Sequence, residues 1–154
     1  VMERKIDEYE QRDRDRNMIV TGLKDNDTSV EDVAKKLSKL HFTIHAQDIE
    51  YVQKLRTTKG PARMKVVFKK EEYKMQIMKS KKRLKGKNDT VWIADDLTQY
   101  RSKLAYRARS YAKEGNIAQT WTFNSKVFIK EQPTSKPKRV FRPEDIPGLE
   151  LEDD

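Results

Sequence analysis

The side chains of this sequence that could do chemistry are mostly cations, and they are concentrated in two blocks. Residues 54–87 hold 14 Lys and Arg against 2 Glu, and residues 101–142 hold 11 against 2 Glu, while the whole chain carries only +9. The last twelve residues hold 6 carboxylates and no basic group. Because each Lys or Arg that meets a phosphate releases condensed counterions, this segregation favours a polyanion site. A highly charged, solvated surface is the alternative interpretation.

Patterns that would indicate catalysis or metal binding are weak. The sequence has no P-loop, no Gly-rich nucleotide fingerprint, no cysteine and no convincing nucleophile–base pair, so we expect neither an enzyme nor a cofactor. His41 and His45 have the spacing of two ligands on a helix, but β-leaning residues between them predict that the helix ends first and that no metal is bound. Asp95 and Asp96 precede a predicted helix, where we expect a carboxylate cap rather than a catalytic pair.

The expected environment is the inside of a cell. No apolar run approaches the roughly 20 residues that span a bilayer, and residues 1–8 lack the apolar stretch of a signal peptide. A chain without cysteine has no disulfide framework and fits a reducing compartment. We therefore expect a soluble, intracellular protein without membrane contact, cytoplasmic, nuclear or both. Residues 81–85 are basic enough for a nuclear signal, but they overlap the proposed binding surface.

Hydrophobic periodicity predicts a β-α-β-β-α-β order over residues 17–95. Alternation indicates strands at 18–23, 49–55, 64–68 and 91–94. A capping box of Thr28 and Glu31 starts one helix that ends near residue 41, and a second helix runs from about 73 to 84. This order is typical of the ferredoxin-like arrangement, in which two helices cover one face of a four-stranded antiparallel sheet. The fold class is α+β, and we interpret residues 17–95 as an atypical RNA recognition motif (RRM).

The open face of that sheet is the predicted binding surface. If Met64 and its alternate neighbours pack inward, Arg63 and Lys65 face solvent, as does Ile19 on the first strand. Ordinary RRMs carry base-stacking aromatics at such outward positions. Charge in their place predicts phosphate contact with weak sequence preference. A ferredoxin-like module that binds protein is the alternative.

Residues 96–149 are predicted to form a smaller α+β domain, followed by an acidic tail at 150–154. A helix after residue 98 has an apolar stripe, with Arg101, Arg107 and Arg109 placed on its other faces. Strands at 120–123 and 126–130 are joined by two residues, which predicts a β-hairpin, and residues 133–139 read as extended and exposed. Trp121 and Phe123 share one face of their strand, where they serve either as core or as a base-stacking platform.

The N-terminal residues 1–16 are predicted to be the C-terminal end of a coiled coil. Met2, Ile6 and Tyr9 are spaced four and three residues apart, as in an a/d seam. One and a half heptads are too few for a stable coiled coil, so we expect further coiled coil before Val1.

The order of these features resembles two related families. Residues 14–17 before the first strand, the basic loop and third strand, and Val-Trp-Ile-Ala-Asp-Asp-Leu-Thr at 91–98 before an Arg-bearing helix are similar to the first-open-reading-frame protein of LINE-type retrotransposons. With Trp-Thr-Phe-Asn-Ser-Lys-Val-Phe-Ile at 121–129, the chain resembles still more the baculovirus few-polyhedra (FP) protein and its transposon-borne relatives. No single motif is specific, but their order covers nearly the whole chain.

The resemblance implies an RNA-binding protein built from a coiled coil, an atypical RRM and a C-terminal domain. The retrotransposon members form trimers, coat their own RNA and act as nucleic-acid chaperones. Residues 5–10 nearly match a trimerisation pattern through Lys5, Ile6, Tyr9 and Glu10, but Lys stands at 5 where the pattern has Arg. Met2, which precedes them in the same a/d seam, is the remaining expected oligomerisation residue. The positions that match RNA-contact positions of the family are Lys54, Arg56, Lys59, Arg63, Lys82, Arg83, Arg107, Arg109 and Lys126, with Phe123 at an aromatic position.

Two classes of function follow from the residues and the resemblance. The first is a protein that binds single-stranded RNA or single-stranded DNA with low sequence specificity and packages it, using the positions above together with Lys65, Arg101 and Trp121. The second is a protein-interaction or structural module whose basic faces meet acidic partners, including its own acidic tail. Salt-dependent binding to a generic oligonucleotide separates the two.

Overall fold

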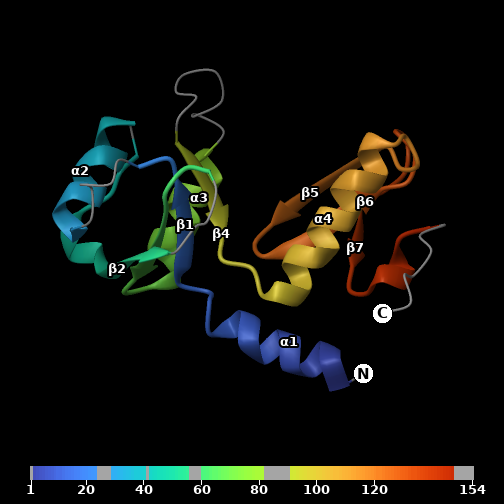
Figure 1. Ribbon diagram of the computed structural model, residues 1–154, viewed down its shortest axis with the longest axis horizontal. Helices are drawn as coiled ribbons and strands as arrows, with labels where there is room; N and C mark the ends of the chain where they lie inside the picture. The colour runs from blue at the N-terminus through green and yellow to red at the C-terminus, as the bar shows by residue number, and fades with distance from the viewer. Residues whose placement is uncertain (1, 24–28, 41, 56–59, 82–90, 148–154) are drawn as a thin grey trace. The chain divides into compact units, whose positions relative to one another are not determined.

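The computed structural model describes residues 2–23, 29–40, 42–55, 60–81 and 91–147 (Figure 1). The chain divides into two compact units. Residues 15–96 form one, which we call the central unit, and residues 1–14 together with 97–154 form the other, which we call the terminal unit. The N-terminal helix therefore belongs with the C-terminal part of the chain, although the sequence predicted it as a separate segment.

The central unit has the predicted β-α-β-β-α-β order. Its elements are β1 (Asn17–Thr21), α2 (Val30–Lys39), a 3-10 turn (Ala46–Asp48), β2 (Ile49–Leu55), β3 (Arg63–Phe68), α3 (Glu71–Ser80) and β4 (Trp92–Asp95). The sheet order is β2-β3-β1-β4, and every neighbouring pair is antiparallel. The two strands of each β-α-β half are thus separated by another strand, as the ferredoxin-like arrangement requires.

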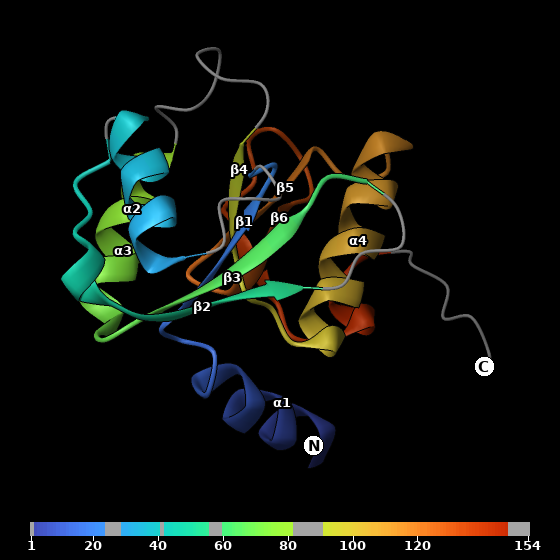
Figure 2. The same cartoon turned by 60° about the vertical axis from the view of Figure 1, so that its left-hand side comes forward.

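The core of the central unit lies between this sheet and its two helices, which lie on the same side of it (Figure 2). Met64, Val66 and Phe68 of β3 are almost fully buried, as the alternation predicted. They meet the apolar stripe of α2, in which Val33 and Leu37 are four residues apart and fully buried. The helices thereby leave the other face of the sheet outside the core.

The helix caps differ from the predicted ones. α2 begins after Ser29, whose side chain accepts a hydrogen bond from the backbone N–H of Asp32 at 3.1 Å. Thr28 lies outside the described residues. The helix also ends earlier than predicted, with Leu40 as its C-cap. Serine is as good an N-cap as threonine, so the sequence predicted the right kind of cap but placed it one residue too early in the chain.

Asp95 and Asp96 do not cap the following helix, so that prediction is wrong. The side chain of Asp95 points to the helix side of the sheet, where its Oδ1 lies 3.6 Å from the ammonium of Lys74 on α3. Both side chains are almost completely buried. Asp96 accepts a hydrogen bond from the side-chain amide of Asn17 at 2.9 Å. The cap is Thr98, whose hydroxyl oxygen accepts from the backbone N–H of Arg101. Both carboxylates thus interact with partners inside the central unit.

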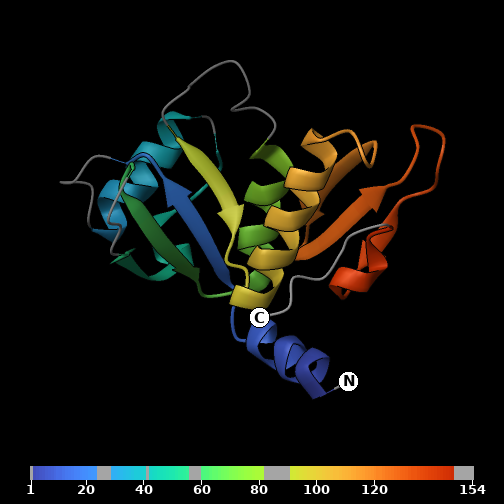
Figure 3. The same cartoon turned by 45° about the vertical axis from the view of Figure 1, so that its right-hand side comes forward.

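The terminal unit packs one long helix on a three-stranded sheet. Its elements are α1 (Met2–Arg12), α4 (Gln99–Lys113), β5 (Gln119–Phe123), β6 (Lys126–Lys130), β7 (Lys138–Val140) and a 3-10 turn (Pro143–Asp145). The sheet order is β5-β6-β7, and α4 lies along its strands (Figure 3). Leu104, Ala105 and Ala108 of α4 share a core with Val127 and Ile129. The sequence missed β7: it treated Lys138 and Arg139, two of the three residues of this strand, as the end of an extended, exposed segment.

The hairpin between β5 and β6 is confirmed. Asn124 and Ser125 join the strands with φ values of 49° and 62°. Two consecutive positive φ values are the mark of a type I′ turn, whose twist matches that of the flanking strands. Asn tolerates this left-handed region better than most residues because its short polar side chain bonds locally.

α1 docks through one face and exposes another. Asp7 and Gln11, four residues apart, are buried, and the Gln11 side-chain oxygen accepts the backbone N–H of Thr98 at 3.0 Å. Ile6 and Tyr9, the apolar residues of the predicted coiled-coil seam, are 54% and 66% exposed. The helix is therefore held by polar contacts, and Ile6 and Tyr9 remain on the surface. Among the described helices, none is long and apolar enough to cross a bilayer.

Candidate nucleic-acid interface

The face of the central sheet that points away from its two helices is organised in rows of residues that lie opposite one another on neighbouring strands. Thr21 pairs with Arg63 on one side and with Trp92 on the other, and Ile19 pairs with Lys65 and Ala94. Tyr51 lies opposite Val67 in the third row. Directly opposed residues project to the same face of a sheet, so these rows share the face away from the helices.

Two aromatic side chains dominate what this face exposes. Trp92 is 65% exposed and Tyr51 is 44% exposed, and the Lys65 ammonium lies 5.8 Å from the centroid of the Tyr51 ring. Arg63 is exposed as predicted, whereas Ile19 lies on this face but is only 4% exposed. The expected charged surface therefore also carries aromatic rings at its edges. Sequence reasoning missed both rings, although Ile93 facing the core already implied that Trp92 faces outward.

The remaining predicted contacts of this unit do not gather on the same face. Lys54 is exposed, but it pairs with Met64, whose side chain is in the core, so it belongs to the helix-covered side. The sheet thus separates Lys54 from Arg63 and Lys65. Four further predicted contacts lie outside the described residues: Arg56, Lys59, Lys82 and Arg83.

The terminal sheet also has a face that points away from its core, and aromatics and cations alternate on it. Trp121 stacks on Phe128 with ring centroids 5.8 Å apart and planes inclined by 15°. Phe123, which is 54% exposed, pairs with Lys126 at the hairpin end. Val127 and Ile129 point the other way, into the core. The alternative that Trp121 and Phe123 are core residues is therefore wrong. Phe128 and Lys130, on the same face, were not singled out from the sequence.

Arg101 is not part of an open surface. It is 6% exposed, its Nε lies 2.9 Å from Asp7 Oδ2, and its Nη1 donates to the carbonyl of Ser125 at 2.7 Å. Its Nη2 lies 3.2 Å from Glu8 Oε1. A guanidinium buried against three protein acceptors is not presented to a phosphate. The expectation that Arg101 contacts nucleic acid is therefore corrected: this residue joins α1, α4 and the hairpin turn.

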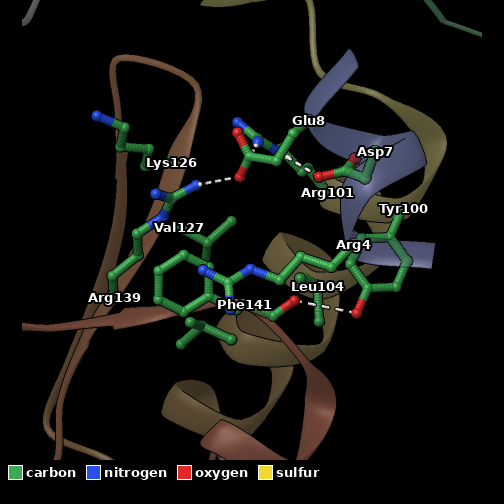
Figure 4. A pocket seen from close by; sticks show the side chains of 11 residues that line it. Arg4, Asp7, Glu8, Tyr100, Arg101, Leu104, Lys126, Val127, Arg139 and Phe141 are labelled. Carbon is green, nitrogen blue, oxygen red and sulfur yellow. Dashed lines mark hydrogen bonds and ion pairs between the residues drawn. The ribbon is translucent and has the colours of Figure 1, made fainter. Parts of the chain in front are cut away.

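A second arginine is drawn into the same cluster. Arg139 Nη2 lies 3.3 Å from Glu8 Oε1, so Glu8 stands between Arg139 and Arg101 (Figure 4). Burial, followed by the charge of Arg101, lowers the pKa of Arg139, and Glu8 opposes the shift. The guanidinium carbons of Arg139 and Arg4 lie 4.2 and 3.9 Å from the centroid of the Phe141 ring. These cations build the junction of α1 with the sheet.

The other arginines predicted on α4 remain accessible. Arg109 is exposed and Arg107 is half-buried, and neither belongs to the core of the terminal unit. Tyr106, which the sequence did not single out, is 64% exposed on the same helix. At 100° per residue, Tyr106 is about half a turn from both Leu104 and Ala108, so it points away from the sheet.

Comparisons with known proteins add little to this geometry. No family model matches the sequence, and no curated protein matches it. Among solved structures, the chain is similar to the RRM3 domain of Mip6, with 24% identical residues and a TM-score of 0.35. That match covers 52% of this chain and 91% of the other. A TM-score this low carries no conclusion, so the fold assignment rests on strand order and pairing.

Proposed function

We propose that this protein is a non-enzymatic binder of single-stranded nucleic acid, with low sequence specificity. The observation that supports it best is common to both units. Each sheet has one face outside its core, and on that face exposed aromatic rings stand beside Lys or Arg side chains. The combination is what a single strand needs, because its bases stack on rings and its phosphates meet cations.

The chemistry of these faces favours weak sequence preference. Every base has a π-face, so stacking on Trp92 or on the Trp121–Phe128 pair accepts any base, at about 1–3 kcal/mol for each. The cations Arg63, Lys65 and Lys126 meet phosphates, which carry no sequence information. An acidic protein partner would need only the cations of these faces, so it would not explain the exposed aromatic rings.

The resemblance to the retrotransposon and FP proteins supports a more specific version of the proposal. In it, the natural ligand is RNA, and the protein packages RNA and acts as a chaperone. The protein also associates with itself through α1 in this version, where Lys5, Ile6, Tyr9 and Glu10 are all exposed. The side chain of Met2, the remaining residue of the predicted a/d seam, lies outside the described part of the chain.

Fluorescence anisotropy with labelled single strands of about 20 nucleotides tests the proposal. We expect binding to RNA and DNA of mixed sequence, with similar affinity for scrambled versions. Replacing Trp121→Ala should weaken binding by about 1–3 kcal/mol, or roughly 5- to 150-fold. Lys65→Ala removes one phosphate contact from the central sheet.

The matched control is Lys35→Ala, which removes an exposed lysine from α2, on the side of the sheet that the helices cover. We expect the control to bind like the unmodified protein. Failure of the unmodified protein to bind any single strand at low salt, with tight binding to an acidic peptide, would refute the proposal.

A further inference from the structure

The terminal unit is built in two layers, and each layer has a side that faces away from the other. α4 turns Leu104 and Ala108 toward the sheet, and the sheet turns Val127, Ile129 and Val140 toward α4. The outer side of the sheet and the outer side of α4 therefore lie on opposite sides of one core. This relation holds within the terminal unit alone.

The outer side of α4 is basic and carries an exposed aromatic ring. The helix QYRSKLAYRARSYAK has 5 Lys and Arg and no acidic residue. Lys103, Tyr106 and Lys113 are exposed along its outer side, Arg109 is exposed beside them, and Arg107 is half-buried. A solvated helix face is commonly stabilised by Glu–Lys pairs at i and i+4, and this face has none because α4 has no Glu. Its cations and ring thus have the composition of a strand-binding surface.

The outer side of the sheet also combines aromatic rings with cations, although Arg139 on this side is paired with Glu8 of α1. There Trp121 stacks on Phe128, Phe123 is exposed, and Lys126 and Lys130 are partly exposed. The two surfaces are separated by the apolar core of the unit, so a short strand lying on one does not occupy the other. Either surface alone would be enough to bind one strand. Because the unit has both, it has surface for a second strand.

We infer that the terminal unit binds two single strands at once, one on the outer side of its sheet and one on the outer side of α4. This inference rests on the proposed function and deepens it, because it identifies how one molecule brings two strands together. The cations on each side reduce the repulsion between the two phosphate backbones. Holding both strands on one unit also raises the effective concentration of one for the other.

Native mass spectrometry of the full chain with an oligonucleotide of about 8 nucleotides tests the inference by counting bound strands, since single-strand sites take about 4–16 nucleotides. The α4 variant is Tyr106→Ala with Arg109→Ala, and the sheet variant is Trp121→Ala with Lys126→Ala. We expect each variant to bind one strand fewer than the unmodified protein and the combined variant to bind two fewer. Lys35→Ala should bind the full number.

Strand annealing, followed by fluorescence transfer between two labelled complementary strands, is the functional readout. We expect the α4 variant to lose acceleration while the Trp121 fluorescence, measured in a Trp92→Phe background, is still quenched by a single strand. All replaced side chains are at least partly exposed, so thermal melts should show each variant still folded.

A result in which the two variants lose the same one strand, and the combined variant loses no more, would overturn the inference and leave the proposed function intact. Retention of full stoichiometry and annealing by the α4 variant would overturn it as well. If the unmodified protein binds no oligonucleotide, the proposed function itself fails.

Discussion

Replacing Asp7 with alanine should unfold the terminal unit more readily than any comparable surface change. Asp7 Oδ2 pairs with Arg101 Nε at 2.9 Å, and both side chains are 7% exposed. The other carboxylate oxygen accepts the hydroxyl of Thr98, which caps α4. Asp7→Ala therefore leaves a buried guanidinium without its main counter-charge and the capping hydroxyl without its acceptor.

The expected loss follows from this burial. Removing one partner of a buried ion pair costs about 3–5 kcal/mol, because the remaining charge stays desolvated. Glu8 and the Ser125 carbonyl still contact Arg101, so we expect the lower end, about 3 kcal/mol. For a unit of this size that corresponds to a fall in melting temperature of at least about 12 °C.

Urea unfolding, followed by the fluorescence of Trp121 in a Trp92→Phe background, measures this loss. The control is Glu10→Ala, an exposed change on the same helix, which we expect to cost no more than about 0.5 kcal/mol. Combining Asp7→Leu with Arg101→Met, which removes both charges, should recover most of the lost stability. A loss below about 1 kcal/mol for Asp7→Ala would show that α1 does not stabilise the terminal unit in solution, and the reasoning would be wrong.

Four further outcomes are expected. Affinity for single strands should fall with salt by about 0.7 log units per phosphate contact per decade, and a flat salt dependence would contradict phosphate binding. This chain should sediment mostly as a monomer at micromolar concentration, because α1 offers too few heptads for more than weak self-association; a tight trimer would mean that the folded units associate. Removing Arg107 and Arg109 together should weaken binding to a long oligonucleotide about as much as removing Arg63 and Lys65, and no loss would exclude α4 from the interface. Ser29→Ala should lower the stability of the central unit by about 1 kcal/mol in thermal melts, and no change would mean that the cap contributes nothing.

The strands and the hairpin could be predicted because the sequence patterns that indicate them are local. Alternation along 64–68 identified the inward side of β3, and a two-residue connection at Asn124 and Ser125 identified the hairpin. Both depend on neighbouring residues alone. The short strand β7 has three residues and no apolar alternation, and it forms by pairing with β6, so no local pattern marks it.

The site was harder to predict because exposure depends on distant residues. Arg101 looked like Arg107 and Arg109, although it lies three and seven residues before Leu104 and Ala108 and so shares their buried side. Its partner Asp7 is 94 residues away in the sequence, and no spacing rule connects them. Conversely, the side of the sheet on which Tyr51 lies depends on an irregularity in the pairing of β2 between Ile49 and Tyr51, which only the paired sheet fixes.

The most direct test of single-strand binding uses the fact that the chain has two tryptophans, one in each unit. In a ¹H–¹⁵N spectrum, the indole N–H signals of Trp92 and Trp121 report separately on the two sheet faces that point away from the cores. We predict that a single-stranded oligonucleotide of mixed sequence shifts both signals to saturation and that added salt reverses both shifts. If neither signal moves while an acidic peptide moves them, the two faces bind protein, and the account of a single-stranded nucleic-acid-binding protein is wrong.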